Sequence, residues 1–290
     1  MVRNPYSLRA RVARKLTRAL FPFFERHLDL NVVPADYYSP IPRVDELPQD
    51  IYERRFSPTG VEMNEAGQLA SLRETLARYL KEFAPKDNPG LSRADAFALY
   101  AMIRDRRPKR IVEIGGGHST LIALEAIKRN RAAGDPVEFV CVEPLPSEIL
   151  KAAAAREDLR LLIRPVQQVD LGLFDETDIL FIDSSHVCRI GGDVTHEMLE
   201  IVPRLPIGAV VHWHDIVLPA NYWREWTEYS LYFWNEGSVL HAFLLFNRAF
   251  KVRWAARYMA LNHEKALTDV LPFYRKGAHI TSFWAERHAP

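Results

Sequence analysis

The sequence predicts an α/β protein with a Rossmann-like, doubly wound and mostly parallel sheet of seven strands, closed by an antiparallel hairpin and preceded by an N-terminal helical extension. From Lys109 onward, short β-branched runs alternate with segments of helical periodicity, which is the pattern of βαβ units in a parallel sheet. The stretch RIVEIGGGHSTLIALEA (110–126) adds a strand, a glycine turn and a helix in immediate succession. In such a turn, backbone N–H groups and a helix N-terminus can meet a ligand.

The expected elements follow from this alternation. Parallel strands are expected at 110–114, 138–143, 159–164, 178–183 and 209–214, and the closing hairpin at 251–255 and 280–284. Helices are expected between them at 119–130, 147–156 and 193–205, and again at 236–247. Ligands of open parallel sheets bind beyond the carboxyl ends of the strands, where the strand order reverses, so the glycine turn should lie at that crevice.

The chain divides into an N-terminal part, residues 1–60, and a main domain, residues 61–290, with a helical lead-in at 65–83 and 92–104. Apolar side chains at four-residue steps predict an amphipathic helix over 7–28: Leu8, Val12, Leu16, Leu20, Phe24 and Leu28. Pro22 should kink this helix or end it early. The five prolines within 31–60 indicate an extended connection, and Ser92 is expected to cap the second lead-in helix.

The helix over 7–28 allows more than one interpretation. It can pack on the core or on a neighbouring subunit of a homo-oligomer. Its polar faces are rich in Lys and Arg, so it can also make a peripheral contact with an anionic membrane. Both interpretations remain open at this stage.

Composition limits the function classes. The 38 Lys and Arg residues balance 37 Asp and Glu residues, so the net charge gives no reason to expect nucleic acid as a partner. Cys141 lies in an apolar run, which favours a buried thiol over a disulfide with Cys188. No apolar run is long enough to cross a bilayer, and arginines interrupt the N-terminal segment where a signal peptide would be apolar. These features predict a cytoplasmic protein.

Two acids accompany the glycine turn. Gly115 and Gly117 would let the backbone approach a ligand, and Glu143, at the end of the second strand, could accept hydrogen bonds from both hydroxyls of a ribose. Glu113 is an acid inside an apolar strand, which requires a polar or cationic partner. The dinucleotide fingerprint needs a further glycine where this chain has Thr120, so a different nucleoside cofactor is indicated.

The motifs VEIGGGHSTL and FVCVEP resemble the first two motifs of the class I S-adenosylmethionine-dependent methyltransferases. The resemblance implies that Glu113, Gly115 and Gly117 surround the amino acid portion of S-adenosylmethionine. It also implies that Glu143 binds the ribose hydroxyls. His118, Ser119 and Thr120 are further candidates through backbone or hydroxyl contacts, and Asp183 is a candidate at the end of the fourth strand. The resemblance covers roughly 111–284, and the first 30 residues lie outside it.

Two downstream strands also end in polar clusters. In DILFIDSSHVCRIGGDV the strand ends at Asp183 and a polar loop continues to His186, and in GAVVHWHDIVLP the strand ends in His212, His214 and Asp215. This pattern resembles the small-molecule O-methyltransferases of the macrocin and catechol types, and therefore implies methylation of a hydroxyl on a small-molecule acceptor. Some members of those branches hold a divalent metal ion at these strand ends. The corresponding ligands here would be Asp183, His214 and Asp215, although His214 replaces an oxygen ligand.

The same residues also support other functions. Without metal, His186 or His214 could take the acceptor proton while Asp183 or Asp215 orients the ring. A metal-dependent oxygenase using His212, His214 and a carboxylate is an alternative, as is a catalytically silent module that only binds S-adenosylmethionine. The aromatic run over 222–234 can wall an acceptor pocket or pack into the core or an oligomer interface.

Overall fold

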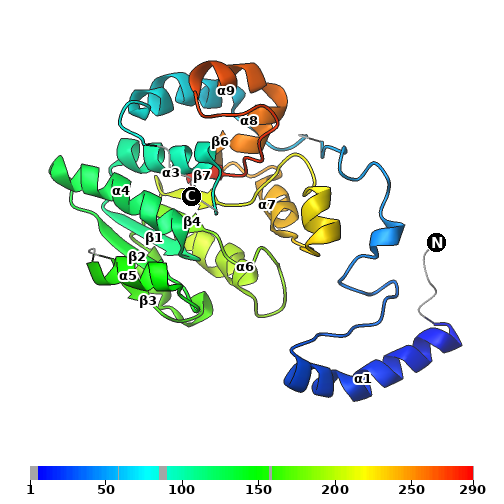
Figure 1. The fold of residues 1–290 in the computed structure, drawn as a ribbon. Helices are drawn as coiled ribbons and strands as arrows, with labels where there is room; N and C mark the ends of the chain where they lie inside the picture. Colours follow the sequence, from blue (N-terminus) through cyan, green and yellow to red (C-terminus); the bar gives the residue numbers. More distant parts are fainter. Residues whose placement is uncertain (1–5, 58, 85–89, 157–158, 290) are drawn as a thin grey trace. The chain divides into compact units, whose positions relative to one another are not determined.

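A seven-stranded sheet in the order β3-β2-β1-β4-β5-β7-β6 is the centre of the computed structural model (Figure 1). The strands are β1 (Arg110–Ile114), β2 (Glu138–Val142), β3 (Arg160–Leu162), β4 (Ile179–Ile182), β5 (Val210–Trp213), β6 (Phe250–Ala255) and β7 (Phe283–Arg287). The first five pair in parallel, whereas β7 is antiparallel to both β5 and β6. The predicted Rossmann-like fold is confirmed, and the strand order reverses at β1, as expected.

The structure describes residues 6–57, 59–84, 90–156 and 159–289. The chain forms two units. The N-terminal unit comprises Met1–Arg54 with Tyr222–Phe233, and the sheet unit comprises Arg55–Asn221 with Trp234–Pro290. Most of the aromatic run over 222–234 therefore belongs to the N-terminal unit, and only Trp234 belongs to the sheet unit.

Helices accompany the strands of the sheet unit. They are α2 (Glu65–Ala70), α3 (Arg93–Arg106), α4 (His118–Ala132), α5 (Glu148–Arg156), α6 (Asp193–His196), α7 (Glu236–Leu244), α8 (Ala256–Asn262) and α9 (Glu264–Val270). Shorter π or 3₁₀ turns continue α2 (Ser71–Thr75, Leu76–Tyr79) and α6 (Glu197–Ile201, Val202–Arg204), and others lie at Val166–Gln168 and Leu171–Phe174. Ser92 caps α3 as predicted, because its hydroxyl accepts a hydrogen bond from the Asp95 N–H at 3.1 Å.

The helices cover both faces of the sheet, as the alternation of side chains along each strand requires. On one face, Ile111, Phe139 and Phe181 pack with α3, α4, α5, α8 and α9. On the other, Val112 and Leu180 pack with α6, α7 and the 3₁₀ turns. Figure 1 shows α3 and α4 side by side, in agreement with their extensive contact. The two covered faces leave the carboxyl ends of the strands as the edge where polar side chains collect.

The closing strands differ in detail from the sequence prediction. They pair antiparallel as expected, but α8 and α9 lie between them in the chain, so they do not form a simple hairpin. The last strand begins at Phe283 rather than at residue 280. The sequence pattern suggested an earlier start because Ile280 and Thr281 are apolar or β-branched. In the structure both residues are buried outside the strand, and Thr281 forms hydrogen bonds with Asp95 and Asp215.

The N-terminal unit is built on α1 (Leu8–Leu28). Ser7 caps this helix by accepting a hydrogen bond from the Ala10 N–H. Pro22 lies inside the helix and does not end it. Two short turns, Val44–Glu46 and Glu225–Tyr229, complete the helical segments of this unit. Among the helices of the described ranges, none combines the length and the apolar character that a bilayer span requires.

Candidate functional site

The glycine turn after β1 is shaped by its contact with the end of β4. Gly115 has a φ of +83°, and a Cβ built on it would lie 1.8 Å from the backbone oxygen of Asp183. Only glycine tolerates both this conformation and this approach. Gly117 differs, because nothing lies within 4 Å of a Cβ built there. Gly115 is therefore required by the fold, whereas Gly117 leaves open space at the start of α4.

Glu113 is buried beneath the first turn of α4. It lies on the same face of β1 as Ile111, and its two carboxylate oxygens accept hydrogen bonds from the hydroxyls of Ser119 and Thr120, both at 2.6 Å. Burial raises the pKa of Glu113 from its ordinary value of 4.5 to about 7, although the two hydroxyl bonds act in the opposite direction. The hydroxyls of Ser119 and Thr120 thus satisfy both carboxylate oxygens of Glu113, and these bonds hold the glycine turn against α4.

Glu143 lies one residue beyond β2 and is half-buried. Its carboxylate accepts hydrogen bonds from the N–H groups of Gly116 at 3.2 Å and Leu145 at 2.8 Å. It also lines a cavity of about 440 Å³ at the carboxyl ends of β1, β2 and β4, which we call the crevice. Its lining residues include Gly115, Glu143, Val166, Asp183, Ser184 and Ser185. The position matches the crevice that the sequence predicted.

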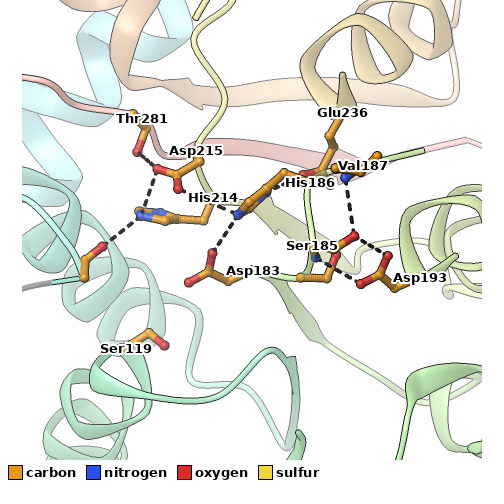
Figure 2. Close-up of polar contacts among 12 residues, drawn as sticks. Ser119, Asp183, Ser185, His186, Val187, Asp193, His214, Asp215, Glu236 and Thr281 are labelled. Atoms are coloured by element: carbon orange, nitrogen blue, oxygen red, sulfur yellow. Dashed lines mark hydrogen bonds and ion pairs between the residues drawn. The ribbon is translucent and has the colours of Figure 1, made fainter. Parts of the chain in front are cut away.

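Three side chains beyond β4 and β5 form an acid–histidine cluster (Figure 2). The Nε2 atom of His186 lies 3.3 Å from Asp183 Oδ1 and 3.7 Å from Asp215 Oδ2. One ligand atom from each of these three residues lies within 4.8 Å of the others, which is compatible with a shared metal ion. His186 and Asp215 both have positive φ angles, of 59° and 50°, which are uncommon for residues other than glycine and frequent at functional sites.

Glu236, the first residue of α7, orients His186. Its Oε2 atom lies 2.7 Å from Nδ1 of His186, and both side chains are buried. With Nδ1–H donating to Glu236, Nε2 is directed toward Asp183 and Asp215. Burial lowers the pKa of His186, but Asp183 and Glu236 outweigh it and raise that pKa well above its ordinary value. The ring of Trp234 lies 4.5 Å from the His186 ring.

Asp215 and Asp183 are held from different directions. Thr281 donates a hydrogen bond to Asp215 Oδ1 at 3.1 Å. Burial raises the pKa of Asp215, whereas the pKa of Asp183 is lowered because His214 and His186 outweigh the effect of burial. The side chains of Asp183 and Asp215 remain 27% and 20% exposed, so both carboxylates are accessible at the cluster.

His214 contacts the cluster from its buried side. Its Nε2 atom lies 3.3 Å from the backbone oxygen of Gly90 and 3.5 Å from Asp215 Oδ1. Burial lowers the pKa of His214, but Asp183, Asp215 and Asp95 raise it above its ordinary value overall. The sequence predicted Asp183, His214 and Asp215 as metal ligands. The structure groups Asp183 and Asp215 with His186 instead, because the His214 ring is turned toward Gly90.

His212 is a core residue. Its ring stacks on Trp284 at 4.3 Å and lies edge-on to Phe181, and burial lowers its pKa well below the ordinary value. It shares a sheet face with His214, as predicted, but is absent from the metal-compatible group found in the described part of the chain. Neither of the two histidines that the oxygenase alternative used, His212 and His214, belongs to that group.

Residues that support the site were not identified from the sequence. Glu236 resembles an ordinary first-turn acid of a helix, and Thr281 belongs to a stretch expected to be a strand. Asp95 was included in a predicted helix, yet it accepts hydrogen bonds from the N–H groups of Thr281 and Ser282, both at 3.0 Å. The one available signal was that Asp95 is an acid amid the otherwise apolar run of α3.

Comparison with known proteins places this geometry in a family. A family model described as a methyltransferase domain matches residues 112–216, which include the glycine turn, Glu143, Asp183, His186 and Asp215. An uncharacterised protein of Archaeoglobus fulgidus is 34% identical over 160 residues, spanning 49% of this chain and 72% of that protein.

Solved structures are more distant. A methyltransferase of Podospora anserina bound to S-adenosylhomocysteine is 17% identical, with 76% of this chain and 88% of that chain covered and a TM-score of 0.46. The O-methyltransferase TomG of Streptomyces achromogenes, in complex with S-adenosylmethionine, is 16% identical, with 79% and 92% covered and a TM-score of 0.44.

The glycine turn gives a prediction about stability. We expect Gly115→Ala to destabilise the protein by more than about 3 kcal/mol, because it adds a backbone clash to a positive φ. Gly134→Ala is the matched control, since Gly134 also has a positive φ but nothing within 4 Å of its Cβ position. It should cost only about 1 kcal/mol. Urea unfolding measures both, and equal losses would contradict the close contact with Asp183.

Glu113 gives a prediction about pH. Its pKa is higher in the folded than in the unfolded protein, so the folded state binds more protons between about pH 4.5 and 7, and this contribution to stability is lost as pH rises through that window. Glu113→Gln removes the titration. Relative to the natural protein, the variant should therefore gain on the order of 3 kcal/mol between pH 4.5 and values above 7. The free energies of unfolding of the two proteins should differ more and more as pH rises. A difference that is the same at every pH would exclude the raised pKa of Glu113.

Proposed function

Since the chain belongs to the methyltransferase family, whose members take the methyl group from S-adenosylmethionine, we propose that it methylates a hydroxyl group of a small molecule. One observation carries the proposal. Asp183 lines the crevice and also belongs to the acid–histidine cluster, so a methyl donor in the crevice and an acceptor at the cluster would meet at the same side chain. Such proximity is the main requirement of a methyl transfer, which is a displacement at carbon.

The crevice suits the donor. S-adenosylmethionine, when bound, supplies an electrophilic methyl group on a positively charged sulfur. The half-exposed carboxylate of Glu143 is the group we assign to its ribose hydroxyls. We assign the backbone of Gly115 and the open space at Gly117, where α4 begins, to its amino acid portion. Glu113, Ser119 and Thr120 would act indirectly, by keeping that turn in place.

The cluster suits the acceptor, and we propose that it holds a divalent cation through Asp183, His186 and Asp215. Such a cation would lower the pKa of a hydroxyl bound beside it. The hydrogen bond from His186 to Glu236 supports this assignment, because metal-binding histidines commonly donate their other N–H to a carboxylate. An imidazole among the ligands favours manganese, iron, zinc or nickel over magnesium.

The electrostatics favour a cation over a metal-free general base. Asp183 and Glu236 raise the pKa of His186 well above its ordinary value, which favours the protonated ring, and a protonated imidazole cannot accept the proton of an acceptor hydroxyl. The same proton occupies the position that a cation would take, so cation binding must release it. His214 is a weaker candidate for the base, because its Nε2 atom is directed to the Gly90 carbonyl.

The donor site can be tested by titration calorimetry with S-adenosylmethionine. Glu143→Ala should weaken binding by about tenfold or more, because the ribose would lose charge-assisted hydrogen bonds worth about 1.5–3 kcal/mol each. Glu148→Ala, an exposed charge in the nearby helix α5, is the control and should bind normally. Unchanged binding by the folded Glu143 variant would remove Glu143 from the site.

The acceptor side can be tested with phenols, sugars and polyketide alcohols, by following release of S-adenosylhomocysteine. We expect transfer to oxygen that stops on chelation and returns with Mn²⁺. General-base catalysis alone would leave the rate unchanged by chelator, and methylation of amines alone would contradict the proposed acceptor. A silent module would bind the donor but transfer to none of them.

Cation binding can also be measured without turnover, by the electron paramagnetic resonance of Mn²⁺. Asp183→Ala and His186→Ala should each weaken Mn²⁺ binding at least about tenfold, and affinity should fall as pH falls, since protons compete for His186. His214→Gln is the matched control and should retain most of the affinity. If His214→Gln abolishes binding while His186→Ala does not, the ligand set is the one predicted from the sequence.

A further inference from the structure

Helix α1 exposes a continuous apolar stripe. Leu8, Val12, Leu16, Leu20 and Phe23 follow one another along one side of the helix, and each side chain is between 46% and 71% exposed. No residue of α1 is buried. Most of the large apolar side chains that the described chain exposes belong to the same N-terminal unit, whereas the sheet unit buries its own in two cores. An exposed stripe of this size is typical of an interaction surface.

The opposite side of α1 is already used by the chain itself. Arg14 forms an ion pair with Asp36 at 2.7 Å, and its guanidinium lies 5.6 Å from the centre of the Tyr38 ring. Thr17, Arg18 and Phe21 line a cavity together with the segment from Val32 to Pro40. Since successive residues of a helix are about 100° apart, these side chains lie roughly opposite the apolar stripe. Within the N-terminal unit, the returning segment therefore covers the side of α1 opposite the stripe and not the stripe itself.

We propose that the stripe binds an anionic lipid surface, with α1 lying in the plane of the membrane interface. Basic side chains flank the stripe at Arg9, Arg11, Lys15 and Arg26, whereas the helix contains a single acid, Glu25. An amphipathic helix with this distribution inserts its apolar side among the lipid acyl chains, while the long basic side chains reach the phosphate groups. α1 is not apolar enough to span a bilayer, so it binds at the surface.

Charge makes lipid a better partner than a second copy of the chain. Two copies packed through their stripes would bring two sets of arginine and lysine side chains together, with few acids to compensate them. Exposed tyrosines within the N-terminal unit, among them Tyr37, Tyr38, Tyr229 and Tyr232, also suit the boundary between lipid and water, where tyrosine is enriched. This inference concerns a surface separate from the crevice and does not depend on the proposed function.

The test is flotation of the full chain with lipid vesicles. It should bind vesicles of phosphatidylcholine mixed equally with phosphatidylglycerol, bind phosphatidylcholine alone far more weakly, and dissociate as salt is raised. Leu16→Glu should reduce binding about tenfold or more, because it places a charge in the middle of the stripe. Arg11→Gln and Lys15→Gln should each reduce binding to the anionic vesicles about fivefold.

Ile207→Glu is the matched control. Ile207 is 60% exposed but lies in the sheet unit, so this variant should bind vesicles like the natural protein. Circular dichroism of each variant establishes that it is folded. Absence of binding to the anionic vesicles, or equal binding by Leu16→Glu and Ile207→Glu, would overturn the proposal. A dimer that Leu16→Glu dissociates, without vesicle binding, would assign the stripe to a second copy instead.

Discussion

The contact between Gly115 and the backbone oxygen of Asp183 is the constraint on which the whole site depends. Strands β1 and β4 are neighbours in parallel, with Ile114 opposite Ile182, so the next residue of each strand emerges at the same edge of the sheet. A side chain at Gly115 would force these two strand ends apart. Because the ends of β1 and β4 stay in contact, the glycine turn, Glu143 and Asp183 line one crevice. Asp183 also belongs to the acid–histidine cluster, which therefore adjoins the crevice.

The charges of the cluster require compensation. Asp183, Asp215 and Glu236 surround two histidines, and each of these groups is largely removed from water. Burying several carboxylates is unfavourable unless cations or hydrogen bonds balance them. Here His186 and His214 supply the balance, and the pKa values of both rings are raised as a result. A cluster of perturbed titratable groups beside a crevice is typical of a functional site.

The sequence predicted the parts of the site that follow from local pattern. Strand and helix alternation placed Gly115, Glu143, Asp183 and Asp215 at the correct edge of the sheet, because parallel strands bring their carboxyl ends together. It did not identify which histidine joins the acids. That choice depends on the turn at His186, whose φ is positive, and on the direction of the His214 ring, neither of which a periodic pattern encodes.

The residues that support the cluster could not be predicted from the sequence for a different reason. Glu236 and Thr281 come from segments far along the chain, and tertiary packing brings them to His186 and Asp215. Glu113 was recognised as an anomaly in an apolar strand, and the expectation that it needed a polar partner is confirmed. Its partners proved to be two hydroxyls of the adjacent helix. The position of a residue along a strand predicts at which edge of the sheet it lies. The hydrogen-bond partner of a buried side chain depends on tertiary packing, which that position does not predict.

The most direct measurement is a crystal structure of the protein grown with S-adenosylhomocysteine and Mn²⁺, with anomalous scattering recorded for manganese. The nucleoside should occupy the crevice with its ribose at Glu143, and a single anomalous peak should lie between Asp183, His186 and Asp215. A nucleoside bound elsewhere would contradict the shared site. So would a manganese peak that none of these three side chains contacts.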